Sequence, residues 1–307
     1  MYSNVTRSEE YKHRFLDFIK NDYGIEAINL TPAKRGFYGE TWRLDAVDAR
    51  YYIKLVYAHA HMPVYERSFP LIQYLYDHGI DFISRIVKTT NGDLYTHFDS
   101  AVLGVFEWID GENIQNEKTK VEEYKMLAKV YTVPSYGISI SREDFSGNTA
   151  VKFFKQWDTL KDEPLCSLFD KNRAKIEHRA VRLKHFSRLC RDDTTDFFIT
   201  HGDAGGNLIE NGDRYFIVDW DNPIFAPMER DAWFCMSWDW AMIAFNDAIR
   251  KNGINYTLRP ERLAYYCYDF FFYYLNAYLD AFTQAYIVEE YIDGWIEESF
   301  RYADNIL

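Results

Sequence analysis

The stretch Thr200-His201-Gly202-Asp203-Ala204-Gly205-Gly206-Asn207, followed by Val218-Asp219-Trp220-Asp221, carries the most information in this chain of 307 residues. The apolar residues 197–200 predict a short strand that leads into the first stretch, and the Asn-Gly pair at 211–212 predicts a β-hairpin between the two stretches. The hairpin folds Asp219 back beside Asn207 and Asp203. We therefore expect three oxygen-bearing side chains at one end of a small sheet, on loops, where chemistry is concentrated.

The transfer of a phosphoryl group from a nucleotide requires such a set of side chains. A carboxylate has to accept the proton of the acceptor hydroxyl group, and Asp203 is placed for this role. Mg²⁺ prefers oxygen ligands and keeps several waters, so one carboxylate and one amide suffice, and Asp219 with Asn207 fit this requirement. Protein kinases have the same order of a catalytic Asp, a metal-binding Asn and a metal-binding Asp after a hairpin.

Two segments resemble a family of small-molecule kinases. Gly202 stands where protein kinases have arginine, and the resulting His-Gly-Asp sequence resembles the aminoglycoside phosphotransferase family. Residues 219–231, Asp-Trp-Asp-Asn-Pro-Ile-Phe-Ala-Pro-Met-Glu-Arg-Asp, are similar to the spectinomycin phosphotransferase branch of that family. The resemblance implies an α+β, two-lobed protein-kinase-like fold. A nucleotide-binding N-terminal lobe with a small antiparallel sheet would span residues 1–109, and a larger, mostly helical C-terminal lobe would span residues 110–307.

The same resemblance implies the cofactors and the acceptor. These are ATP or GTP with Mg²⁺, and a hydroxyl group of a small molecule of aminoglycoside or aminocyclitol type. The chain departs from the family pattern at one point, because Asn207 follows Asp203 by four residues where the family usually has five. Gly205 and Gly206 supply the backbone freedom that closes the tighter loop. The sequence leaves open whether this loop still places Asn207 on the metal.

A glycine turn, a strand lysine and a helix glutamate occur in the order of a kinase nucleotide site. Gly36 and Gly39 lie between strands predicted over 28–34 and 40–44, where backbone N–H groups can cover phosphates, although an ordinary turn is the more common meaning of Gly-x-x-Gly. Lys54 lies on the strand predicted over 51–56, where kinases hold the α- and β-phosphates. Glu66 begins the helix predicted over 65–78. The resemblance implies that Glu66 pairs with Lys54, and an exposed acid favoured by the helix dipole is the alternative.

The end of the strand predicted over 101–108 is the position of the hinge between the lobes in the resembled family. The resemblance implies that the backbone of Glu107 and Ile109 hydrogen-bonds the adenine. Backbone contacts leave no side-chain signature, so the sequence does not distinguish ATP from GTP. Further predicted elements are a helix over 8–21, a strand over 85–89 and helices over 117–133, 150–159, 165–189, 229–248 and 260–285.

The composition is ordinary for a soluble globular protein, with 48% hydrophobic and 27% charged residues. The net charge of -12 disfavours nucleic acid as a partner and suits a cationic acceptor such as an amino sugar, although solubility alone also explains it. The four cysteines form no C-x-x-C pair and the N-terminus has no apolar run, so we expect a reduced, cytoplasmic setting. The apolar region 265–287 is interrupted by Asp269, Asn276 and Asp280, which indicates a buried helix and no membrane span. The helical spacing of its aromatic residues favours core packing over a sugar-binding platform.

Three alternatives remain open at this stage. The acceptor could instead be choline, homoserine, a methylthio-sugar or another metabolite, because a fold and a catalytic core do not determine a substrate. The chain could bind a nucleotide without transferring a phosphoryl group, or His201 could ligate the metal of a hydrolase together with Asp203, Asp219 and Asp221. The glycine turn, Lys54 and Glu66 are unexplained by a hydrolase, so a kinase is favoured. The identity of the acceptor and the oligomeric state cannot be inferred from the sequence.

Overall fold

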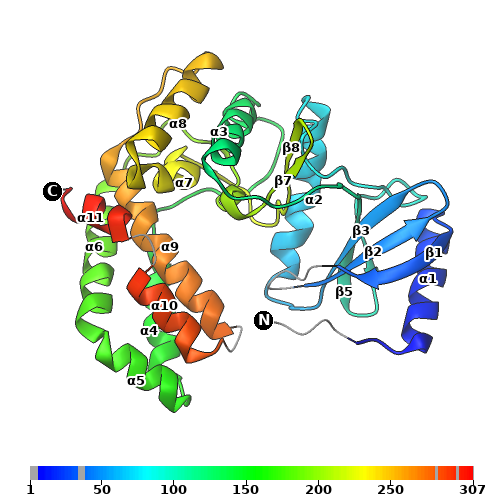
Figure 1. Cartoon of the computed structure of the whole chain (residues 1–307), viewed down its shortest axis with the longest axis horizontal. Helices are drawn as coiled ribbons and strands as arrows, with labels where there is room; N and C mark the ends of the chain where they lie inside the picture. The colour runs from blue at the N-terminus through cyan, green and yellow to red at the C-terminus, as the bar shows by residue number, and fades with distance from the viewer. Residues whose placement is uncertain (1–5, 34–38, 281–282, 295–296, 307) are drawn as a thin grey trace. The chain divides into compact units, whose positions relative to one another are not determined.

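The computed structural model describes residues 6–33, 39–280, 283–294 and 297–306 (Figure 1). Internal contacts divide the chain into two compact units. Unit 1 consists of Met1–Ser141 and His201–Ile224, and unit 2 consists of Arg142–Thr200 and Phe225–Leu307. The lobe boundary expected between residues 109 and 110 stays a prediction.

Unit 1 is built on a five-stranded antiparallel sheet with the strand order β1-β2-β3-β5-β4. The predicted combination of an antiparallel sheet in the N-terminal part and a mostly helical remainder is confirmed. The strands are β1 (Ala27–Pro32), β2 (Glu40–Ala46), β3 (Arg50–Val56), β4 (Thr96–Phe98) and β5 (Ala101–Glu107), and two helices, α1 (Glu9–Tyr23) and α2 (Met62–Asp77), flank the sheet in Figure 1.

The two faces of this sheet are covered by different helices. Ser8 caps the N-terminus of α1 by accepting a hydrogen bond from the Tyr11 backbone, and the helix buries Phe15 and Ile19 against one face. That face carries Ile53 and other apolar strand residues, whereas Lys54 points to the opposite face because side chains alternate along a strand. The α2 helix packs on the second face, next to Lys54.

Gly104 on β5 allows this close approach of α2. It pairs with Lys54 across the β3–β5 ladder. A Cβ atom at position 104 would lie 2.5 Å from the Phe69 ring and 3.0 Å from the Tyr65 hydroxyl oxygen, both of which belong to α2. Glycine within a strand marks such a site of close packing, and any larger side chain would push α2 away from the lysine.

The rest of unit 1 carries the loops that the sequence analysis singled out. Its elements are α3 (Glu117–Val130), the 3₁₀ turn η1 (Ala204–Gly206) and the hairpin strands β7 (Leu208–Asn211) and β8 (Arg214–Ile217). The hairpin is confirmed, but its two turn residues are Gly212 and Asp213, because Asn211 still pairs with Arg214. Gly212 has a φ of 59°, which glycine adopts without steric cost.

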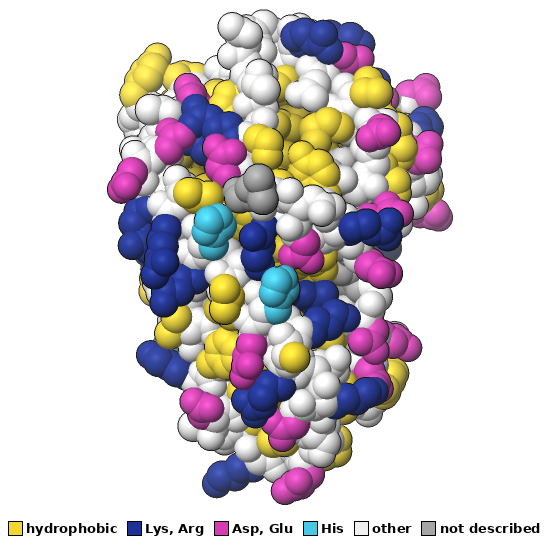
Figure 2. Space-filling view, turned by 90° about the vertical axis from the view of Figure 1, so that its left-hand side faces the viewer, with side chains coloured by type: hydrophobic (Ala, Val, Ile, Leu, Met, Phe, Trp, Pro, Cys, Tyr) yellow, Lys and Arg dark blue, Asp and Glu magenta, His cyan; other side chains and the backbone are white. Residues whose placement is uncertain are grey.

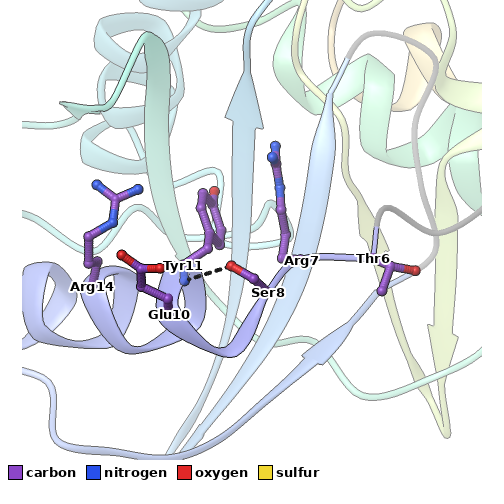
Figure 3. A pocket seen from close by; sticks show the side chains of 6 residues that line it. All are labelled: Thr6, Arg7, Ser8, Glu10, Tyr11 and Arg14. Carbon is purple, nitrogen blue, oxygen red and sulfur yellow. Dashed lines mark hydrogen bonds between the residues drawn. The ribbon is translucent and has the colours of Figure 1, made fainter.

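A surface cavity of about 560 Å³ lies at the beginning of α1 (Figure 3). Arg7 and Arg14 flank Tyr11 at this cavity. Both guanidinium groups are bound by carboxylates of unit 1, Arg7 to Glu40 at 2.6 Å and Arg14 to Asp99 at 3.1 Å. The residues that line it include none of the predicted site residues.

Unit 2 consists of helices around α9 (Pro260–Asp280), with a short two-stranded sheet of β6 (Phe198–Thr200) and β9 (Ile224–Ala226). Most aromatic side chains of α9 are buried, and several make ring contacts with neighbouring helices, such as Phe272 with Phe153 and Tyr268 with Phe186. The expected core packing is therefore observed. The other helices are α4 (Asn148–Thr159), α5 (Glu163–Lys171), α6 (Arg173–Arg191), α7 (Glu229–Ala232), α8 (Asp239–Lys251), α10 (Ala285–Gly294) and α11 (Glu297–Asp304).

Three predicted elements are wrong, because two predicted helices are each interrupted and one predicted strand does not form. The helix expected over 165–189 is split into α5 and α6 at Asn172, whose side chain donates to the carbonyl oxygen of Leu168 and so competes with the helical backbone. The helix expected over 229–248 is split into α7, a 3₁₀ segment (Trp233–Ser237) and α8, because Trp238 is extended and packs its ring on Phe234. The strand expected over 85–89 is reduced to a bridge between Ile86 and Phe106.

The surface of unit 2 carries charges of both signs. Lys and Arg side chains are interspersed with Asp and Glu on the face shown in Figure 2. Exposed ion pairs such as Lys171 with Glu289, at 2.8 Å, connect neighbouring helices, although pairs of this kind contribute little stability in water. Within the described residues, no helix combines the length and the apolar character that crossing a membrane requires.

Asp269 on α9 is a half-buried carboxylate among the aromatic side chains of unit 2. It accepts a hydrogen bond from the Thr149 hydroxyl at 2.6 Å. Burial raises the pKa of Asp269 to about 7, although the Thr149 hydrogen bond lowers it. Because the folded pKa lies above the ordinary value of about 4, the folded state binds this proton more tightly than the unfolded chain. The stability that this proton provides is complete below pH ~4 and is lost as the pH rises through about 7.

We expect Asp269→Asn to stabilise the protein at pH 8 by about 2 kcal/mol, discounted for the partial exposure of this residue, and to have little effect at pH 4. The amide keeps the acceptor for Thr149 but cannot ionise. Urea unfolding of the wild type and the variant at several pH values measures the difference. Asp280→Asn, at the exposed end of the same helix, is the control. An equal gain at pH 4 and pH 8 would show that ionisation of Asp269 is not its origin.

Candidate active site

Lys54 is the centre of a charged cluster in unit 1. It lies in the middle of β3 and its side chain is 6% exposed. Its ammonium group donates to Oδ1 of Asp219 at 2.7 Å and to Oδ2 of Asp221. Two carboxylates from the segment that follows β8 thus neutralise a lysine that the strand alone would leave as an unpaired buried charge.

The backbone after β8 brings both carboxylates to the lysine. Asp219 has a φ of 63°, a left-handed conformation that aspartate tolerates better than most side chains. Trp220, between the two acids, is buried and donates from Nε1 to the carbonyl oxygen of Ile217 at 3.0 Å. With the tryptophan anchored in the interior, the side chains on either side of it reach Lys54.

Electrostatics couple these three groups. Burial lowers the pKa of Lys54, but Asp221 and Asp219 oppose this effect and hold the pKa well above its ordinary value. Burial raises the pKa of Asp221. Burial also acts to raise the pKa of Asp219, but attraction to Lys54 and the hydrogen bond to it hold that pKa below the ordinary value. The side chains of Asp219 and Asp221 remain 40% and 35% exposed, so solvent screens these effects. The lysine is charged at neutral pH, and the carboxylates are accessible to a ligand.

His201 organises the loop that precedes η1. The backbone N–H of Asp203 donates to Nδ1 of His201 at 3.1 Å, so Nδ1 is an acceptor. The other nitrogen, Nε2, then carries the proton and donates to the carbonyl oxygen of Val218 at 3.0 Å. The ring also packs edge-on against Trp220, with centroids 4.6 Å apart. Both ring nitrogens therefore serve the loop, as expected for a kinase, and neither points to a metal-ligand role.

Asn207 lies beside Asp203 in spite of the shortened spacing. Its Nδ2 donates to the carbonyl oxygen of Asp203 at 2.7 Å and to the Asp203 carboxylate at 3.4 Å. Both bonds use the amide nitrogen, so neither uses Oδ1, the atom that a cation would bind. The backbone of Asn207 also accepts from Val218 at 2.9 Å, next to Asp219. The compact η1 turn thus brings Asp203, Asn207 and the start of the Asp219 segment together, as predicted.

The donor atoms of this site are of the kind that Mg²⁺ prefers. Asp203, Asn207, Asp219 and Asp221 all offer carboxylate or amide oxygens. Among the residues that the structure describes, no group of three or more His, Cys, Asp and Glu side chains has the arrangement of a metal site. One or two carboxylates with an amide and waters, as Mg²⁺ uses, fit the residues present.

Comparison with solved structures gives matches over nearly the whole chain. Spectinomycin phosphotransferase, APH(9)-Ia, in its AMP-bound complex has a TM-score of 0.75 at 18% identity, with 96% of this chain and 98% of that chain covered. Its complex with ADP and spectinomycin has a TM-score of 0.71 at 18% identity, with 95% and 93% covered. Amicoumacin kinase hAmiN, in complex with AMP-PNP and Ca²⁺, has a TM-score of 0.65 at 13% identity, with 98% and 97% covered. No protein-family model matches the chain, and the comparison with curated proteins gives no match either.

The chain has the aminoglycoside phosphotransferase fold. Within this fold, the structure departs from the expected partner of the strand lysine. Glu66 on α2 is bonded to Nε2 of His97 at 3.0 Å, and Lys54 is bonded to Asp219 and Asp221. The pairing of Lys54 with Glu66 that the resemblance implied is therefore absent from this structure, because the α2 side chain that faces the lysine is Tyr65.

The structure describes only some of the other residues that were predicted to contact a nucleotide. Gly36 lies outside the described residues. Gly39 is buried against β3, where a Cβ atom would lie 2.9 Å from the carbonyl oxygen of Leu55. The backbone N–H of Glu107 donates to Arg85, and its carbonyl oxygen accepts from Ser84. Contacts of Gly36, Gly39, Glu107 and Ile109 with a nucleotide stay predictions.

The Glu-Arg-Asp block that resembles the spectinomycin phosphotransferase branch has structural roles in unit 2. Arg230 donates to the hydroxyl oxygen of Thr200 at 3.0 Å and so holds β6. Glu229 accepts from the Tyr256 hydroxyl at 2.9 Å and from the Arg259 backbone at 2.6 Å. This part of the block thus supports the scaffold, which agrees with the view that it preserves structure and need not define the acceptor.

Sequence reasoning missed Asp221 and Tyr65 as neighbours of Lys54. The Asp-x-Asp pattern after β8 was a usable signal for Asp221, since it places a second carboxylate two residues after the predicted metal ligand. For Tyr65 there was no comparable signal. Its position one residue before Glu66 changes the direction of a helical side chain by about 100°.

Proposed function

We propose that this protein is a small-molecule kinase that transfers the γ-phosphoryl group of ATP or GTP to a hydroxyl group of an aminoglycoside- or aminocyclitol-like acceptor. The observation that carries the proposal is the clustering of Lys54 with Asp219 and Asp221, next to a loop in which Asn207 binds Asp203. A charged lysine, a candidate base and oxygen donors for a cation are the groups that phosphoryl transfer uses.

Each side chain has a distinct role in this proposal. Asp203, which is exposed, orients the acceptor hydroxyl group and takes its proton. Asn207 and Asp219 hold Mg²⁺, which, when bound, neutralises charge on the phosphates. Lys54 binds and orients the phosphates. Catalysis then rests mainly on placement and on charge stabilisation, because the attacking and leaving groups need little covalent help from the protein.

Support for the acceptor class comes from similarity. The structures with this fold include a spectinomycin complex and an amicoumacin kinase, and residues 219–231 resemble the spectinomycin phosphotransferase branch. The net charge of -12 favours a cationic aminocyclitol. A metabolite such as choline, homoserine or a methylthio-sugar is the alternative acceptor.

The first experiment is a thermal-shift screen of ATP, GTP and ADP with and without Mg²⁺, followed by phosphorylation assays on an acceptor panel that includes spectinomycin and kanamycin. We expect Mg²⁺-dependent stabilisation by a nucleoside triphosphate and phosphorylation of an aminocyclitol. Expression in a sensitive bacterium gives an independent measure through resistance. Nucleotide binding without any modified antibiotic would direct the assignment to a metabolite kinase. Failure to bind any nucleotide would overturn the proposal.

A further inference from the structure

A buried tyrosine hydroxyl lies beside the lysine of the site. Tyr65 is 3% exposed, and its hydroxyl has no hydrogen-bond partner in the part of the chain that the structure describes. The Lys54 ammonium lies over the Tyr65 ring, 5.4 Å from its centroid. The hydroxyl oxygen lies so close to Gly104 that a Cβ atom there would be 3.0 Å away, and Gly104 is the residue paired with Lys54. The hydroxyl therefore lies over the Lys54–Gly104 pair of the sheet.

Such a group requires an explanation, because burying a hydroxyl without a partner destabilises the folded state. Burial raises the pKa of Tyr65 well above its ordinary value, so the side chain stays a neutral hydroxyl that can accept one hydrogen bond and donate another. The cation that lies over the Tyr65 ring is Lys54. In this structure the lysine is already bonded to Asp219 and Asp221.

A carboxylate that also binds a metal cation attracts the Lys54 ammonium less strongly than it does in this structure. Asp219 is the side chain that we propose for Mg²⁺, so a bound metal weakens its bond to the lysine. Glu66 does not replace it, because it is bonded to His97. The α2 residue that faces the ammonium is Tyr65, which offers both an aromatic face and an oxygen acceptor. A cation over an aromatic ring is attracted most strongly where water is excluded, as it is at this buried lysine.

We infer that Tyr65 is the positioning residue for Lys54, in the role that the resemblance assigned to Glu66. The ring face already lies beneath the ammonium. Once Asp219 also binds a cation, the hydroxyl oxygen accepts a hydrogen bond from Lys54 and keeps the ammonium extended toward the phosphates. This inference rests on the proposed function, since it concerns how the same lysine binds a nucleotide. It also explains why position 104 is glycine, because a side chain there would displace the Tyr65 hydroxyl from the lysine.

The test compares three conservative variants of the full chain. Tyr65→Phe removes only the hydroxyl. Glu66→Gln removes the charge of the residue that the resemblance paired with Lys54, so it distinguishes a role of Glu66 from a role of Tyr65. Tyr23→Phe is the matched control, because Tyr23 is also buried, its hydroxyl also has no partner among the described residues, and it lies on α1 on the other face of the sheet. Titration calorimetry with AMP-PNP and Mg²⁺ measures Kd without turnover. We expect Tyr65→Phe to raise Kd about tenfold, as the loss of a hydrogen bond to a charged group does, and the other two to bind like the wild type.

A double-mutant cycle shows whether Tyr65 acts through Lys54. In the Lys54→Met background, Tyr65→Phe should change Kd little further, whereas a purely structural effect would add to that of Lys54→Met. With an identified acceptor, Tyr65→Phe should raise KM for the nucleotide more than it lowers kcat. The inference would be overturned if Tyr65→Phe bound AMP-PNP with the affinity of the wild type. It would also be overturned if Glu66→Gln lost as much nucleotide affinity as Lys54→Met. Either result would leave the kinase proposal intact. A wild-type protein that binds no nucleotide would overturn both.

Discussion

Replacement of Asp203 by asparagine is expected to lower kcat by a factor on the order of 10² to 10⁴, the usual contribution of a general base, while nucleotide affinity stays close to that of the wild type. The amide cannot accept the proton of the acceptor hydroxyl group. Phosphorylation assays with an identified acceptor measure kcat, and calorimetry with AMP-PNP and Mg²⁺ measures binding.

The structure indicates that this substitution removes the base without disturbing the loop. The bond from the loop to His201 is made by the backbone N–H of residue 203, which asparagine keeps. Asn207 donates to the residue 203 carbonyl oxygen and, more weakly, to its side-chain oxygen, and an amide oxygen can still accept that bond. An unchanged thermal unfolding midpoint is the control. Turnover near the wild-type rate would show that another group takes the proton.

Replacement of Asp219 by alanine is expected to abolish the enhancement of nucleotide binding by Mg²⁺ and to reduce turnover by about a hundredfold or more, because the charge stabilisation that a catalytic metal supplies amounts to several kcal/mol. The variant deletes the carboxylate proposed as the main metal ligand. Nucleotide Kd values with Mg²⁺ and with EDTA, measured for the wild type and the variant, give the metal dependence directly.

The exposed Asp213 in the turn between β7 and β8 provides the matched control for this measurement. Asp213→Ala removes one negative charge from the same hairpin without touching Lys54, so its metal dependence should equal that of the wild type. Asp219→Ala also leaves Lys54 with Asp221 as its carboxylate partner. Retention of the full Mg²⁺ effect in Asp219→Ala would assign the metal to other oxygens of the site.

The local elements of this protein could be predicted from its amino-acid sequence. Hydrophobic periodicity placed α1, β2 and β3 within a few residues, because burial of one face imposes its period on the chain. The Asn-Gly signal predicted the hairpin that brings Asp219 back toward Asn207, although the pairing moved its turn by one residue. These features depend on residues that are close to one another in the chain, so their signals are visible in the sequence.

The side chains that contact Lys54 could not be predicted from local sequence patterns, because they depend on how distant segments pack. The side chain of Tyr65, and not that of the adjacent Glu66, faces the lysine, because packing of α2 over Gly104 sets the rotation of the helix. Glu66 is then close to His97, and the carboxylates come from residues 219 and 221, far along the chain. Helix rotation is a collective result of many buried contacts, so no single residue of α2 carries a signal for it.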